Sequence, residues 1–151
     1  MTDVRLTPAH RRALDLQKEG LVRAAEILLS EGEVTAIPKN KLGDSQLNNL
    51  LAIANETESP AVVTNFIRYQ MGRDGQGRHW SRPGASGRKL GDLFIDAIET
   101  GAVHQAVEAV GLTGVERQLA HIYLTRHFLG FVSRHLKYLE PQRAQGREDA
   151  A

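Results

Sequence analysis

Residues 113–140 read TGVERQLAHIYLTRHFLGFVSRHLKYLE, and this stretch decides the fold class. With a helical period of about 100° per residue, its apolar side chains gather on one side of a single long helix. That side comprises Val115, Ile122, Leu124, Phe128, Leu129, Phe131, Val132, Leu136 and Leu139. These residues cover about half of the circumference, which is typical of a helix at the centre of a bundle. Thr113 is the expected N-cap, and the helix should end before Pro141.

The rest of the chain repeats the helical period and contains no useful length of the alternating pattern of a strand. The pairs Thr7-Pro8 and Ser59-Pro60 are start signals, because proline suits the first helical position. The earlier helices are predicted over residues 8–30, 45–54, 60–72, 90–99 and 102–110, and Gly20 is a point where the first could divide. The sequence therefore predicts a single-domain, all-α bundle of five or six helices over residues 1–141. Residues 73–89 are expected to form a flexible, glycine-rich basic loop, and residues 142–151 a disordered polar tail.

The composition is that of an ordinary globular domain. The chain has 151 residues, of which 41% are hydrophobic and 25% charged, and its formal net charge is +1. It has no cysteine, which excludes disulfides, thiolate metal sites and cysteine nucleophiles. No apolar run approaches the roughly 18 residues that cross a bilayer, and the first residues do not resemble a secretory signal. We therefore expect a cytoplasmic protein without a membrane partner, whose affinity for anions depends on where its charges lie.

Positive charge is concentrated between Arg68 and Lys89 on an otherwise nearly neutral chain. The cations are Arg68, Arg73, Arg78, Arg82, Arg88 and Lys89, with Asp74 as the one acid, and His79 and the sole tryptophan, Trp80, lie among them. Guanidinium groups match phosphate geometry, glycines let backbone N–H groups approach an anion, and an exposed indole can stack on a base. This combination indicates nucleic-acid binding. The alternative is a solubilising loop whose tryptophan folds back onto the core.

A second group of cations lies on the polar side of the last helix. Arg126, His127, Gly130, Arg134 and Lys137 share one stripe with no carboxylate among them. Such a stripe can bind phosphates, and Gly130 is unfavourable in the middle of a helix unless another group must approach it closely. The alternative is a solvated face, whose cations near the C-terminal end are favoured by the helix dipole.

Catalytic functions are less well supported by the residue pattern. Asp92, Asp96 and Glu99 share one helical face and could hold a divalent cation, but they are also the expected solvent face of an amphipathic helix. His79 is the one candidate for a general base, and no placed nucleophile or carboxylate supports it. The sequence therefore predicts a protein that is not an enzyme and that uses no metal or cofactor.

Two stretches resemble the small helical subunit of type III CRISPR effector complexes. Residues 41–51, KLGDSQLNNLL, are similar to that family's opening pattern Leu-x-x-Ser-Gln-hydrophobic-x-Asn-hydrophobic-hydrophobic. Residues 66–73, FIRYQMGR, resemble its apolar helix that ends in Tyr-x-x-Gly-Arg. The last helix, from Leu119 to Tyr138, is also similar to the family's closing helix, which is rich in aromatic and basic residues. The glycine-rich loop and the extended tail depart from the family's pattern.

The resemblance implies a non-catalytic protein of prokaryotic antiviral defence that contacts the backbones of guide RNA and target RNA through basic residues. It also implies partners among the other subunits of a multi-subunit complex, with self-association left open. The residues that it assigns to RNA are Lys41, Arg68, Arg73, Arg126, Arg134 and Lys137. The residue pattern leaves two other functions open: a helical protein–protein interaction module without nucleic acid, and a small metal- or histidine-dependent nuclease.

Overall fold

The computed structural model describes residues 4–37, 44–74 and 79–143 of the chain. These residues form seven α-helices, three short 3₁₀ helices and no strand, so the prediction of an all-α fold is confirmed. The α-helices are α1 (Pro8–Asp15), α2 (Lys18–Glu31), α3 (Asp44–Glu56), α4 (Pro60–Asp74), α5 (Leu90–Glu99), α6 (Ala102–Val110) and α7 (Gly114–Leu139). The 3₁₀ helices are η1 (Val34–Ala36), η2 (His79–Ser81) and η3 (Glu140–Gln142).

The first predicted helix is in fact two helices, of which α1 begins at a side-chain cap. The Thr7 hydroxyl accepts a hydrogen bond from the backbone N–H of His10 at 3.1 Å, and His10 Nδ1 accepts one from the Thr7 N–H at 3.2 Å. This capping box satisfies two N–H groups at the start of α1 that would otherwise have no partner within the helix. The division between α1 and α2 falls at residues 16–17, and not at Gly20, which lies inside α2.

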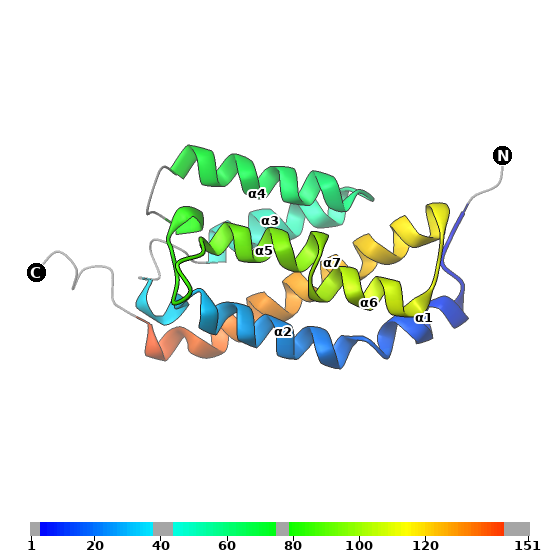
Figure 1. Ribbon diagram of the computed structural model, residues 1–151, viewed down its shortest axis with the longest axis horizontal. Helices are drawn as coiled ribbons and strands as arrows, with labels where there is room; N and C mark the ends of the chain where they lie inside the picture. The colour runs from blue at the N-terminus through cyan, green and yellow to red at the C-terminus, as the bar shows by residue number, and fades with distance from the viewer. Residues whose placement is uncertain (1–3, 38–43, 75–78, 144–151) are drawn as a thin grey trace, which may run out of the picture.

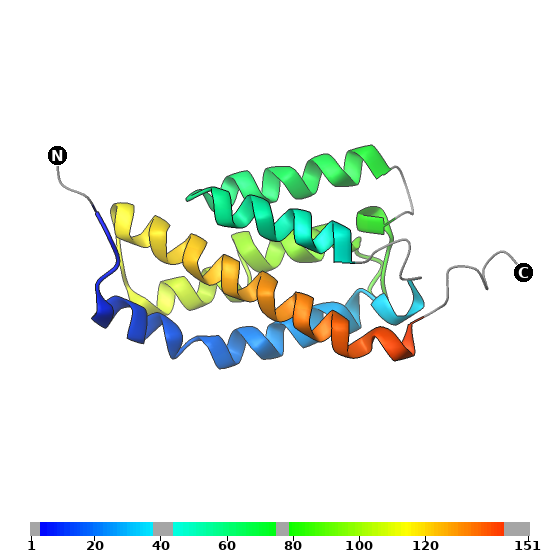
Figure 2. The same ribbon diagram turned by 180° about the vertical axis from the view of Figure 1, so that it is seen from behind.

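Helix α7 is the central element of the bundle. It packs against α2, α3 and α6, and Figure 2 shows it crossing the molecule between α2 and α3 with one side towards the viewer. Helices α4, α5 and α6 lie on the opposite side (Figure 1), where α5 packs on both α4 and α6. Helix α7 therefore has one side in the core and one side that faces outwards.

The core contains most of the side chains that the helical period predicts. Phe128, Val132 and Leu136 of α7 are buried, as expected. The helical period also places Val62 and Val115 on the inward sides of their helices, but Val62 is 46% exposed and Val115 is 57% exposed. Val115 lies in the first turn of α7, and Val62 lies beside the buried Val63 on α4. Both positions are at the edge of a buried face, where a small rotation of the helix determines whether the side chain is buried or exposed.

Residues 79–89, which we term the η2 segment, lie between α4 and α5 and form hydrogen bonds to other elements. The Ser81 hydroxyl donates to the carbonyl of Met71 in α4 at 2.9 Å. The N–H of Ala85 donates to the carbonyl of Glu31, the last residue of α2, also at 2.9 Å. Over these residues the irregular loop that the sequence predicts is a structured connection, while residues 75–78 lie outside the described part of the chain.

The first two residues of the predicted tail, Gln142 and Arg143, are part of the folded structure. Residues 140–142 form η3, and Arg143 is only 5% exposed and donates from Nε to the carbonyl of Ile37 at 3.2 Å. Residues 144–151 lie outside the described residues. None of the described helices is both long enough and apolar enough to cross a membrane.

Candidate nucleic-acid interface

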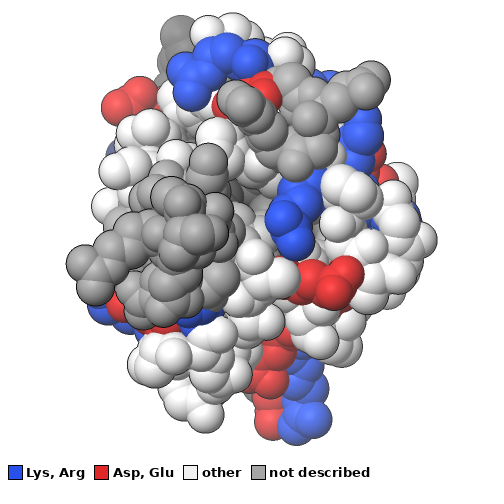
Figure 3. All heavy atoms as spheres, turned by 90° about the vertical axis from the view of Figure 1, so that its left-hand side faces the viewer, with Lys and Arg blue, Asp and Glu red and all other residues white. Residues whose placement is uncertain are grey.

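The cations of the predicted basic loop do not form one surface. Arg68 donates from its two terminal nitrogens to the carboxylate of Glu99 at 3.2 and 3.0 Å, and Arg88 is ion-paired with Asp96. Two longer pairs share one carboxylate: Arg73 with Asp74 at 3.9 Å, and His79 with Asp74 at 3.4 Å. Figure 3 shows the end of the molecule where α4 finishes, and its described Lys and Arg side chains lie apart from one another and near acidic ones. These cations are therefore largely engaged by carboxylates of the same chain.

The tryptophan expected to stack on a base is buried. Trp80 is 1% exposed, and its ring meets that of Phe94 edge-on with centroids 5.1 Å apart. The prediction of an exposed stacking residue is wrong, and the indole folds back onto the core because α5 offers it an aromatic partner. Of the remaining predicted residues, Lys89 is exposed, Arg82 is half-buried, and Lys41 and Arg78 lie outside the described residues.

The residues of the stripe predicted on the last helix are half-buried or exposed, unlike the buried residues Phe128, Val132 and Leu136 of the same helix. We define the outer face of α7 as Tyr123, Arg126, His127, Gly130, Arg134 and Lys137. No Asp or Glu occurs in the sequence between Glu116 and Glu140. A Cβ atom placed on Gly130 would meet no side chain and no neighbouring element of the described chain within 4 Å. The outer face thus presents positive charge without acids of its own helix, around a glycine that no neighbouring helix requires.

Arg126 has a structural role in addition to its charge. Its Nε donates to the carbonyl of Ala54 at 2.8 Å, and its Nη2 donates to the carbonyl of Thr57 at 2.7 Å. These bonds satisfy carbonyl groups at the end of α3 and fix the direction of the guanidinium group. The other two cations of the face are Arg134, whose guanidinium lies 5.8 Å from the ring centroid of Phe131, and Lys137, whose Nζ lies 3.0 Å from a carboxylate oxygen of Glu140.

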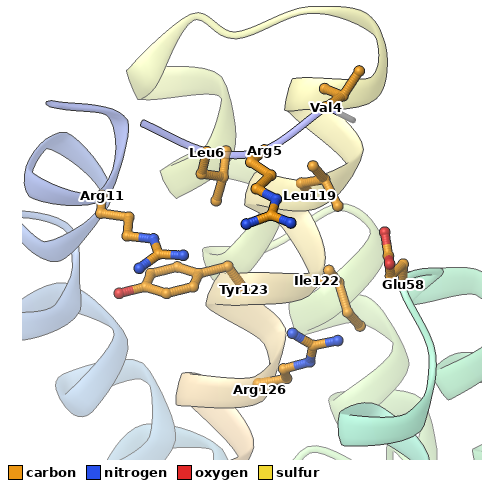
Figure 4. A pocket seen from close by; sticks show the side chains of 9 residues that line it. All are labelled: Val4, Arg5, Leu6, Arg11, Glu58, Leu119, Ile122, Tyr123 and Arg126. Carbon is orange, nitrogen blue, oxygen red and sulfur yellow. The ribbon is translucent and has the colours of Figure 1, made fainter. Parts of the chain in front are cut away.

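A hollow of about 380 Å³ opens beside the first half of the outer face. This arginine hollow is lined by Val4, Arg5, Leu6, Arg11, Glu58, Leu119, Ile122, Tyr123 and Arg126. In Figure 4, Arg5 and Arg126 point into it from opposite sides, Arg11 lies beside the ring of Tyr123, and Glu58 lies at the far edge. Among the described residues that line the hollow, three guanidinium groups from three separate segments accompany one carboxylate, so the hollow suits an anion that carries an apolar part.

Two arginines of the hollow, Arg5 and Arg11, were not predicted from the sequence. Both lie near the N-terminus, far along the chain from Arg126, and neither belongs to a local cluster that resembles a binding motif. Only the packing of α1 and the preceding segment beside α7 brings the three together. The one signal in the sequence was the stripe on the last helix, which identified Arg126.

Tyr123 separates the arginine hollow from a charged pair on the other side. Its hydroxyl donates to Asp15 at 2.8 Å, and Lys18 Nζ lies 2.9 Å from the same carboxylate oxygen and 5.4 Å from the ring centroid. Hydrogen bonds from Lys18 and then from Tyr123 lower the pKa of Asp15, while burial and the bond to Asp15 raise the pKa of Tyr123. Asp15 is therefore ionised and paired with Lys18 rather than with the arginines of the hollow.

Two histidines of α7 should make stability depend on pH. Burial lowers the pKa of both His121 and His127, and the charge of Lys18 lowers that of His127 further. As the pH falls through the ordinary histidine value of about 6.5, the unfolded chain takes up protons before the folded chain does. The free energy of unfolding should therefore decrease between about pH 7 and pH 5.5, as measured by urea denaturation at each pH. The double variant H121Q/H127Q should show a weaker dependence, and an unchanged slope would assign the effect to other groups.

Two of the three acids considered as metal ligands take part in ion pairs. Asp96 and Glu99 are ion-paired with Arg88 and Arg68, as described above. Within residues 4–37, 44–74 and 79–143, no three His, Asp or Glu side chains are placed so that they could hold a metal ion. The face of α5 that carries these acids thus provides links to α4 and to the η2 segment.

Comparisons with protein-family models, with curated protein sequences and with solved structures give no match to this chain. The stretches that resemble the CRISPR small subunit fall, within the described residues, on the start of α3, the second half of α4 and most of α7.

Proposed function

We propose that the chain is a non-catalytic, RNA-binding helical subunit of a ribonucleoprotein, of the kind found in type III CRISPR effector complexes. The observation that carries the proposal is the arginine hollow, which lies beside an outer face of α7 that has no acidic residue of its own. The resemblance of residues 41–51, 66–73 and 119–138 to the small subunit supports this particular kind of complex.

Phosphate is the anion that this arrangement suits best. A guanidinium group offers a planar fork of donors that matches phosphate oxygens, and Arg126 is already held in place by two backbone carbonyls. Arg134 and Lys137 continue the positive charge along α7 beyond the hollow. Binding to phosphates releases counterions and carries no sequence information, so affinity should weaken steeply with salt and the protein should read mainly the backbone.

The variant R5A/R11A tests this proposal without disturbing the core, because both side chains are exposed. Its matched control is R68A/R88A, which removes the same charge from the cations that the sequence favoured. Fluorescence anisotropy with single-stranded RNA at two salt concentrations measures both. We expect R5A/R11A to weaken binding about tenfold and to reduce the salt slope by about 0.7 for each phosphate that is no longer neutralised. The control should bind nearly as tightly as the unmodified protein.

Equal effects of the two double variants would show that net charge alone attracts the RNA. If only R68A/R88A bound RNA more weakly, the binding site would be the basic stretch that the sequence predicts and not the arginine hollow. A helical protein–protein interaction module predicts that neither variant changes the binding of its partner. RNA that co-purifies with the assembled complex extends the test to the protein in its source cells. An assembly that contains the chain but no RNA would contradict the proposal.

A further inference from the structure

A second depression lies between α2 and the C-terminal half of α7. Its volume is about 310 Å³, and its lining residues are Val22, Glu26, Phe131, Arg134, His135 and Tyr138. We call it the α2–α7 groove. Three of these six side chains carry aromatic or imidazole rings, and Tyr138 is 70% exposed although it is a large ring. An exposed ring beside a groove is a surface on which another flat group can stack.

The rings of the groove are already arranged for stacking. His135 and Tyr138 lie nearly parallel, with centroids 5.5 Å apart and an angle of 28° between their planes. The guanidinium of Arg134 lies 5.8 Å from the ring centroid of Phe131, and the ring centroids of His127 and Phe131 are 6.2 Å apart. The series of rings therefore continues from the groove along the outer face of α7 towards the arginine hollow.

Glu26 gives the groove a hydrogen-bond acceptor among its rings. Neither an ion pair nor a hydrogen bond engages its exposed carboxylate among the described residues, unlike the carboxylates of Glu99 and Asp96. A carboxylate accepts hydrogen bonds at two oxygens, so it selects a ligand with two adjacent donors. Guanine presents such a pair at N1–H and the N2 amino group. Uracil instead has a single N–H between two carbonyl groups that a carboxylate would repel.

We infer that the α2–α7 groove binds an unpaired nucleobase that carries an amino group, guanine above the others. The base stacks on Tyr138 and Phe131, Glu26 accepts hydrogen bonds from its edge, and Arg134 contacts the adjoining phosphate. This inference rests on the proposed RNA-binding function and adds to it a preference for guanine. Paired bases cannot enter the groove, so the RNA that lies along α7 is single-stranded at this point.

The experiment compares a short RNA of uridine alone with one of alternating uridine and guanosine. The unmodified protein should bind the guanosine-containing RNA more tightly. The variant Y138A should weaken that binding about tenfold, because the base no longer has a ring on which to stack. The matched control is Y69A, which removes a tyrosine of α4 that is 59% exposed and does not line the groove. It should bind both RNAs as the unmodified protein does.

Glu26→Gln should reduce the preference for guanosine while binding to uridine RNA stays the same. Circular dichroism spectra that match those of the unmodified protein establish that each variant is folded. Equal binding of the two RNAs, or equal effects of Y138A and Y69A, would overturn the inference and leave the phosphate binding of the hollow intact. The absence of any RNA binding by the unmodified protein would overturn both. Reduced self-association of Y138A without a change in RNA affinity would overturn the inference by showing that the groove is a protein interface.

Discussion

Replacing Trp80 by alanine should lower the free energy of unfolding by about 3–5 kcal/mol, the usual range for a buried aromatic residue. The side chain is 1% exposed and packs edge-on against Phe94, so its removal leaves a cavity that the helices around it cannot fill. The cavity would lie where the η2 segment meets α4 and α5. Urea denaturation followed by circular dichroism measures the change.

Two variants calibrate this result. Trp80→Phe retains an aromatic ring and should be destabilised less than the alanine variant, whereas Leu16→Ala removes a side chain that is 82% exposed and should change stability very little. RNA affinity, measured at a temperature where the variant is folded, should be unchanged by W80A. A stable W80A protein with weakened RNA binding would contradict the burial of the indole and restore the sequence-based hypothesis of a stacking residue.

The helices could be predicted from the sequence because local signals determine where they begin and end. Thr7 and Ser59, each followed by proline, precede α1 and α4, and the predicted helix over residues 90–99 is observed with the same bounds. Capping and periodicity act within a few residues, so one stretch of chain contains all the information needed. Even the error at Gly20 was local, since the division fell only a few residues away.

The sequence could not show whether the cations of the basic loop are ion-paired, because their acidic partners are distant in sequence. Arg68 and Glu99 are 31 residues apart, and only the packing of α4 against α5 joins them. The composition of the loop shows that it is basic, but it does not show which carboxylates will face it. The same holds for Trp80, whose burial depends on Phe94 in the next helix.

The arginines of the candidate site likewise include some that the sequence predicts and some that only the structure reveals. Arg126 and Arg134 were predicted because they belong to one helix, where a regular period shows which residues share a side. Arg5 and Arg11 were missed because their approach to Arg126 is a property of how α1 and the segment before it pack beside α7. A stripe on a helix can thus be identified in a sequence, whereas a hollow between three segments requires the structure.

Gly84→Ala should destabilise the fold by about 3 kcal/mol, at the upper end of the usual range for overpacking. A Cβ at this position would lie 2.2 Å from the carbonyl oxygen of Glu31 and 2.8 Å from the Cα of Gly32. Both are backbone atoms, so no side chain can rotate away. The η2 segment would have to separate from the end of α2 and break the hydrogen bond from the Ala85 N–H to Glu31.

Two other glycines separate this clash from the general effects of a glycine substitution. Gly87 has open space around it but a φ of +82°, so G87A should cost about 1 kcal/mol through backbone strain alone. Gly20 lies inside α2 with nothing within 4 Å, and G20A should stabilise the protein by up to about 1 kcal/mol. Urea denaturation should therefore rank the stabilities, from highest to lowest, as G20A, unmodified, G87A and G84A. If G84A were as stable as G87A, the η2 segment would not be docked on α2, and its arginines would again be available to bind RNA.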